Sequence, residues 1–165
     1  TCRSQQGTGK VLLPFFEWCE STVIASTIQN SLWLFPVIEA VHLLGLCLLG
    51  GSILLVDLRL MGFGLTHQSV SELNRQVRPW LLVAVIVMIA TGVPLFLSEA
   101  IKCYYNRAFW VKITTLPLAL AFTFLVRNRI ARADSKVAYI NAATGAISVV
   151  LWFVVAAAGR WIGYS

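Results

Sequence analysis

Two ionisable residues, Glu39 and His42, lie within a long apolar stretch and could carry chemistry. They are three residues apart, so on a helix they share one face. Ionisable side chains inside a membrane span are rare and by default indicate function. With a rise of about 1.5 Å per residue, Glu39 would lie about 12 Å and His42 about 16 Å into a helix that begins at Ser31. We expect this face to point into a helix bundle, because a carboxylate in hydrocarbon is costly.

Several charged residues are expected to enter the bundle from the same side of the membrane. Lys112 lies one turn inside a later apolar segment, and others lie at the ends of apolar segments. The sequence therefore predicts a buried polar cluster of Glu39, His42, Glu99, Lys102, Lys112 and Arg160. The favoured role of this cluster is to hold the helices together by hydrogen bonds and ion pairs. The alternatives are a proton or ligand site and the ligation of haem by His42.

The haem alternative depends on the number of ligands that the sequence offers. A b-type haem between membrane helices usually takes two axial ligands, and His42 near mid-depth could supply one. The second histidine, His67, is expected in a loop beyond the span. Met88 or a partner chain could supply the other ligand. Haem b is therefore a cofactor that the sequence allows and does not require.

No motif for a metal site or for catalysis is present. The cysteines Cys2, Cys19, Cys47 and Cys103 show no CxxC or Cys/His spacing, so we expect no zinc site. There is no Walker loop, GxGxxG, GxSxG, HExxH or EF-hand loop, so no catalytic residue is predicted and a non-enzymatic role is favoured. Cys19 and Cys103 are expected on one side of the membrane, and two free thiols are favoured there over a disulfide.

The composition decides the broad class of the protein. Of 165 residues, 58% are hydrophobic and 12% are charged, against usual shares of about 45–50% and 25%. This excludes a disordered chain and argues against a soluble domain. The net charge of +6 does not indicate a nucleic-acid partner, because the 13 basic residues are spread between apolar runs. We expect an integral membrane protein whose partners are the lipid bilayer and other membrane subunits or further copies of itself.

Four apolar segments are long enough to cross a hydrocarbon core of about 30 Å. They cover about 31–56, 80–97, 109–126 and 138–158. A capping box at Ser69–Glu72 predicts a short surface helix, after which Pro79 and Trp80 open the second span. The mixed segment 14–29 is interpreted as an interfacial amphipathic helix, the alternative being the first turns of the next helix. The fold class is therefore all-α: a single domain of four transmembrane helices preceded by an interfacial helix.

The N-terminal segment and the basic residues bear on the start and the orientation of the chain. Residues 1–10 are polar and are interpreted as a leader that is absent from the native protein. The reason is that Val11 could be the translation of a GUG start codon. The alternative is that residues 1–10 are the native N-terminus. Seven basic residues fall in the two loops after the first and third spans. The other side has four if the chain starts at Val11, and six if Arg3 and Lys10 are counted. This difference predicts that both termini face the periplasm.

Four segments carry a resemblance: FPVIEAVHLLGL, VDLRLMGFG, LFLSEAIKCYYNRAFWVK and AGRWIGY. They resemble a family of small bacterial four-span membrane proteins known as a domain of unknown function, over residues 15–164. The resemblance implies a protein of the bacterial inner membrane and no particular activity. The chain is also loosely similar to the membrane domain of copper-resistance D proteins, which has intramembrane histidines. A histidine often stands near the end of the third span in that family, whereas this chain has Phe124–Arg127, which argues against a two-histidine site.

Three hypotheses for the function follow. The first is an accessory or structural subunit of a membrane complex, without catalysis. The second is a redox protein linked to b-type haem or quinone through His42. The third is a small proton-coupled transporter or channel that uses Glu39 and Lys112.

Overall fold

The computed structural model describes residues 9–64, 67–133 and 137–162. Within these ranges the chain is helical and has no strand, which confirms the all-α class. The helices in chain order are α1 (Gly9–Glu20), α2 (Val23–Gln29), α3 (Leu34–Leu60), α4 (Val70–Ser98), α5 (Ala100–Tyr105), α6 (Arg107–Ala121), the π-helix η1 (Phe122–Arg127), α7 (Asn128–Ala133) and α8 (Ala138–Ile162).

Four helical segments in the described part of the chain are long and apolar enough to cross a membrane. They are α3, α4, the continuous run α6–η1–α7 over Arg107–Ala133, and α8. Large apolar side chains cover their outer faces; Leu44 on α3 is 70% exposed and Ile86 on α4 is 65% exposed. Exposure of this kind suits contact with lipid chains, so the chain is a multi-pass membrane protein.

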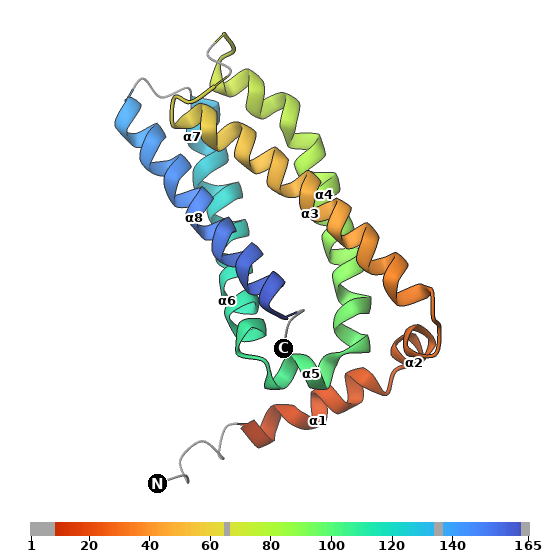
Figure 1. Cartoon of the computed structure of the whole chain (residues 1–165). Coiled ribbons are helices and arrows are strands. Elements are labelled where there is room, and N and C mark those ends of the chain that lie inside the picture. Colours follow the sequence, from red (N-terminus) through yellow and green to blue (C-terminus); the bar gives the residue numbers. More distant parts are fainter. Residues whose placement is uncertain (1–8, 65–66, 134–136, 163–165) are drawn as a thin grey trace, which may run out of the picture.

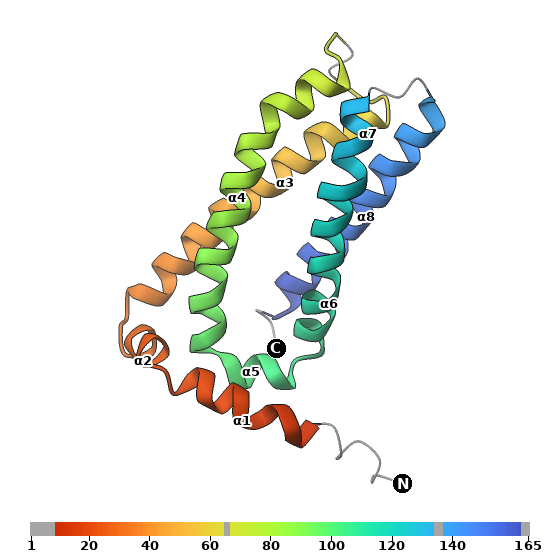
Figure 2. The ribbon, with the colours of Figure 1, turned by 180° about the vertical axis from the view of Figure 1, so that it is seen from behind.

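The spans form two pairs that meet at one end of the molecule. Helix α3 packs along α4, α6 packs along α8, and α3 also packs against α8. Figures 1 and 2 show that the pairs lie close together near α7 and diverge towards α1 and α5. Buried apolar clusters occupy both ends, with Val56, Leu60 and Leu73 near α7 and a second group beneath α1. The bundle is therefore narrow at the α7 end and wide at the α1 end.

The N-terminal helix of the predicted bundle is confirmed, and it has two parts. The chain leaves the helical path at Ser21 and starts again at α2, where Thr22 Oγ1 accepts a hydrogen bond of 3.4 Å from Ala25 N. Helix α1 lies across the wide end of the bundle at a steep angle to the spans (Figure 1). Its residues Phe16 and Cys19 are buried against α5, whereas Trp18 is 64% exposed. Residues 1–8 of the expected leader lie outside the described residues, and residues 9 and 10 already belong to α1.

The second span differs from its prediction. Instead of a short surface helix followed by a span from Pro79, α4 is one continuous helix of 29 residues. Ser69 Oγ accepts a hydrogen bond of 3.2 Å from Glu72 N, so the predicted N-terminal cap is present. Pro79 cannot donate a hydrogen bond to the carbonyl of Arg75, but membrane helices tolerate proline where other groups meet the freed carbonyl. The first and third spans also extend further at their C-terminal ends than predicted, so that Asp57 and Arg127 lie inside helices.

The close approach of α3 to α8 supplies a test of this packing. A Cβ atom at Gly145 would lie 2.8 Å from the backbone oxygen of Asp57 and 3.0 Å from Met61 Cγ, whereas one at Gly51 would meet nothing within 4 Å. Both Gly→Ala changes gain about 1 kcal/mol of helix propensity. We expect Gly145→Ala to lose about 1–3 kcal/mol through overpacking and Gly51→Ala to lose nothing. The unfolding midpoints of the two purified variants in detergent measure this, and equal midpoints would contradict the packing.

Candidate functional site

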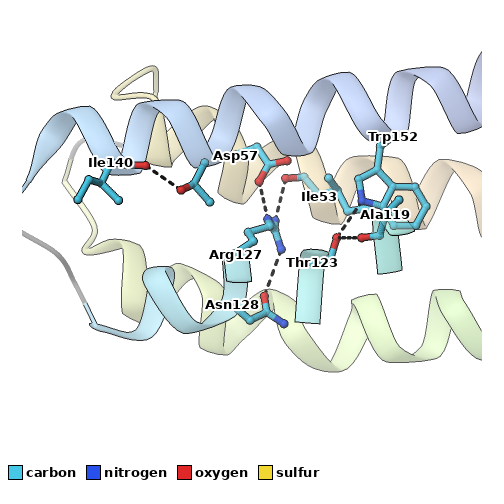
Figure 3. Close-up of polar contacts among 9 residues, drawn as sticks. Ile53, Asp57, Ala119, Thr123, Arg127, Asn128, Ile140 and Trp152 are labelled. Carbon is cyan, nitrogen blue, oxygen red and sulfur yellow. Dashed lines mark hydrogen bonds and ion pairs between the residues drawn. The ribbon is translucent and has the colours of Figure 1, made fainter. Parts of the chain in front are cut away.

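The most deeply buried charged residues form an ion pair between two spans. Asp57 lies in the last turn of α3 and is 0% exposed, and Arg127 ends η1 and is 1% exposed. Arg127 Nε donates a hydrogen bond to Asp57 Oδ1 (Figure 3). A charge in this surrounding is stable only when it is paired and hydrogen-bonded. The pair therefore joins the first and third spans at the narrow end of the bundle.

The guanidinium of Arg127 is satisfied on all three nitrogens. Besides the bond to Asp57, Nη2 donates to the backbone oxygen of Ile53 at 3.0 Å and Nη1 donates to Asn128 Oδ1 at 3.3 Å. Figure 3 shows the side chain reaching from the third span towards α3. This rigid fork is a property of arginine, and a lysine ammonium could not match it. The contacts fix the position of Arg127 as well as neutralising its charge.

A π-helical turn brings Arg127 to this position. Four of the six buried residues of the third span follow at steps of four: Ala119, Thr123, Arg127 and Ala131; the other two are Phe109 and Asn128. In a regular α-helix each step of four turns the side chain by about 40° around the axis. The π-helical turn of η1 contains more residues per turn and compensates for this rotation, so the four residues stay on one face of the helix. Thr123 on that face accepts a hydrogen bond of 3.0 Å from Trp152 Nε1, which links the face to α8.

Two further polar atoms are buried beside the ion pair, Asp57 Oδ2 and Ser148 Oγ. Ser148 is fully buried on α8, one turn from Gly145, and Gly145 lies against the backbone of Asp57. Ser148 lies close enough to act on the Asp57 carboxylate as a hydrogen-bond donor, so α8 contributes to the polar contact between α3 and the third span.

The sequence interpretation missed this pair. It placed Asp57 at the end of the first span and Arg127 among the basic residues of a loop, as markers of topology. The structure corrects both, because each lies inside a helix with its charge turned into the bundle. The spacing of small residues around Arg127 was the available signal. A second was that Asp57 follows Glu39 by 18 residues, which is five turns of an α-helix and returns to the same face.

His42 lies nearer the wide end and has a defined hydrogen-bonding arrangement. His42 Nδ1 and Thr91 Oγ1 are 2.8 Å apart, and Thr91 Oγ1 donates to the backbone oxygen of Val87 at 2.6 Å. A hydroxyl carries a single proton. When Thr91 donates it to the carbonyl of Val87, Thr91 accepts from His42 Nδ1–H, and the neutral imidazole then carries its proton on Nδ1. His42 Nε2 keeps its lone pair and makes no hydrogen bond to any described residue.

The six residues of the predicted polar cluster do not form one hydrogen-bonded group, although the charge of Lys112 acts on His42 and Glu99 pairs with Lys102. Glu39 is exposed and has no hydrogen bond or ion pair with the described residues, although it is one turn from His42. Lys112 is half-buried, with Nζ 3.5 Å from where a Cβ of Gly159 on α8 would lie. Lys102 and Glu99 form an ion pair of 3.6 Å at α5.

No hydrogen bond joins the remaining candidates to His42 in the part of the chain that the structure describes. Arg160 is exposed near the end of α8, and His67 is exposed between α3 and α4. The sulfur of Met88 lies 3.4 Å from where a Cβ of Gly45 would be, so it fills the contact between α3 and α4. His42 with Thr91 is therefore the part of the predicted site that has a specific geometry.

Cys19 and Cys103 are free thiols within one apolar cluster beneath α1. Burial raises the pKa of Cys103 to about 11, with the neighbouring carboxylate of Glu99 as a second cause. Burial also raises the pKa of Cys19. Neither thiol is placed as a nucleophile or a metal ligand, because both roles need the thiolate. Within the described residues no group of three or more His, Cys, Asp or Glu side chains could hold a metal ion.

The thiol chemistry gives one prediction. With a pKa of about 11, about a thousandth of the Cys103 thiol is ionised at pH 8, so iodoacetamide should modify it slowly in the folded protein. The rate should rise as the pH is raised towards 11. Mass spectrometry of the labelled peptides measures this, with the same chain unfolded in dodecyl sulfate as the control. Equal labelling of the folded and unfolded chain at pH 8 would contradict the burial of Cys103.

The ion pair gives a second prediction. Arg127→Met leaves the buried carboxylate of Asp57 without a partner and should destabilise the protein by about 3–5 kcal/mol. Asp57→Asn leaves the guanidinium uncompensated and should also destabilise it. The double variant contains neither charge, so we expect it to be more stable than Arg127→Met alone. The unfolding midpoints of the unaltered chain, the two single variants and the double variant, measured in one detergent, form a double-mutant cycle. Purely additive effects would show that the pair does not hold the spans together.

The comparisons with known proteins give one match. Residues 15–165 match the model of a family described as "Family of unknown function (DUF6644)". No curated protein and no solved structure matches the chain. The comparisons thus give no support to the similarity with copper-resistance D proteins. Since the match covers nearly the whole chain, this protein belongs to the DUF6644 family of unknown function.

Proposed function

We propose that this protein is a membrane-embedded subunit that holds a b-type haem through His42. The observation that carries the proposal is the contact of His42 Nδ1 with Thr91, which leaves Nε2 without a hydrogen bond to the described residues; we assign the proton to Nδ1 because Thr91 can donate its own proton to Val87. A histidine that binds a metal almost always donates its other N–H to a neighbouring group, which fixes the ring and its tautomer. Thr91 takes this role, and Thr91 is itself fixed by Val87.

The donor set fits a haem with one histidine ligand. Nε2 of a neutral imidazole is the usual donor to haem iron. His67 cannot join His42, because the connection between α3 and α4 lies at the far end of the span. Met88 packs against Gly45 and would have to leave that contact to serve as a second ligand. When bound, haem would supply one-electron chemistry, and the protein would supply the ligand, its orientation and the apolar surroundings.

The proposal joins two of the functions expected from the sequence. The connections between the four spans are too short to form an extramembrane domain. We expect an electron carrier in this bundle to exchange electrons with a quinone or with a neighbouring membrane subunit. An accessory role in a larger complex and a redox role through His42 are then two aspects of one function.

The transport hypothesis has less support. It needs Glu39 and Lys112 to act together, and no contact between them exists in the part of the chain that the structure describes.

We also propose that the protein lies in the bacterial inner membrane with both termini on the periplasmic side. The orientation depends on leaving out residues 1–10. Because Arg127 is buried, the count of basic residues is then six against four, and it becomes six against six when Arg3 and Lys10 are included.

Optical spectra of the purified chain after incubation with haem test the proposal. We expect a Soret band that shifts on reduction and is absent in His42→Ala. Thr91→Val removes the acceptor for Nδ1–H and should weaken haem binding about 10-fold or more. His67→Ala is the matched control and should bind haem as the unaltered chain does. Equal loss of the band in His67→Ala, or an unchanged band in His42→Ala, would overturn the proposal.

A further inference from the structure

A basic pocket lies between α4 and α7 at the narrow end of the bundle. Its volume is about 400 Å³, and its lining residues are Ser71, Glu72, Asn74, Arg75, Arg78 and Arg132. It is separate from His42 and from the Asp57–Arg127 pair. We propose that this pocket binds the phosphate group of an anionic phospholipid.

The charge of the pocket is concentrated on two arginines. Three arginines and one glutamate line it, which gives a net charge of +2. Arg75 Nη2 is paired with Glu72 Oε2 at 2.9 Å, so these two charges largely cancel. Arg78 on α4 and Arg132 on α7 have no carboxylate partner among the described residues. Two guanidinium groups from different helices thus meet at one pocket, and their planar forks suit phosphate oxygens.

Asn74 adds a neutral polar group to the pocket. It lines the pocket and is 3% exposed as a residue, and its side-chain amide is not among the buried polar groups that lack a partner in the described residues. A phosphate oxygen in the pocket would accept the N–H groups that Asn74 offers.

The position of the pocket along the bundle matches the level of lipid headgroups. Arg78 directly precedes Pro79 and Trp80, and residues 79–98 carry no charge. Trp80 is 60% exposed, and exposed tryptophans gather at the membrane–water interface. Arg132 lies one residue before the end of the third span. Basic pockets between membrane helices at this level bind phospholipid headgroups.

Native mass spectrometry of the full chain in detergent tests the proposal. The probes are phosphatidylglycerol, phosphatidylcholine and inorganic phosphate, each added alone and then in competition. We expect one phosphatidylglycerol to be retained in preference to phosphatidylcholine. Arg78→Gln and Arg132→Gln should each weaken its binding about fivefold, and the double variant about 30-fold. The unfolding midpoint without lipid should stay unchanged, because both arginines are exposed.

Arg129→Gln is the matched control. Arg129 lies on α7 three residues before Arg132, is exposed and does not line the pocket. The control should retain phosphatidylglycerol as the unaltered chain does. Equal retention of the two lipids, or an equal loss in Arg129→Gln, would overturn the proposal. If inorganic phosphate binds and phosphatidylglycerol cannot displace it, the pocket is a site for a free anion, and the proposal of a phospholipid is overturned.

Discussion

The arrangement of the spans depends on one interaction, the buried ion pair between Asp57 and Arg127. A single charge at this depth would be expelled or neutralised, so each residue requires the other. Arg127 also bonds to the backbone of Ile53, which fixes the height of the third span against α3. The π-helical turn of η1 departs from regular α-helical geometry in order to point Arg127 inwards. The pair therefore sets both the contact between the spans and their register.

The consequences of this constraint reach the rest of the bundle. The narrow end brings α8 against Asp57 through Gly145 and places α7 beside α4, where the basic pocket lies. His42 is 15 residues from Asp57 on the same helix, which is about 22 Å. There the helix pairs diverge (Figure 2), and the histidine is held by its own contact with Thr91. The molecule thus combines a charged, fixed end with a wider end that offers a free imidazole nitrogen.

The sequence predicted the spans well, because a long run of apolar residues is stable in a membrane as a helix that crosses the hydrocarbon core. It also separated His42 from His67 by their surroundings. It failed for Asp57 and Arg127, since a charge at the end of an apolar run is normally a loop residue and the π-turn leaves no mark in hydropathy. It grouped Glu39, Lys112 and Arg160 from their depth alone. Whether residues at equal depth meet depends on which helices are neighbours, and at the wide end the pairs diverge.

The central claim about function is that His42 presents an unprotonated Nε2 while Nδ1 holds the proton towards Thr91. Nitrogen NMR of the histidine side chains measures this directly, and the chain has only two histidines to assign. In the protein without haem at neutral pH, we expect His42 to show a protonated Nδ1 and an unprotonated Nε2, and the signals of the exposed His67 serve as the internal comparison. Substitution of Thr91 by valine should remove this difference. A proton on Nε2 of His42 in the unaltered chain would contradict the account.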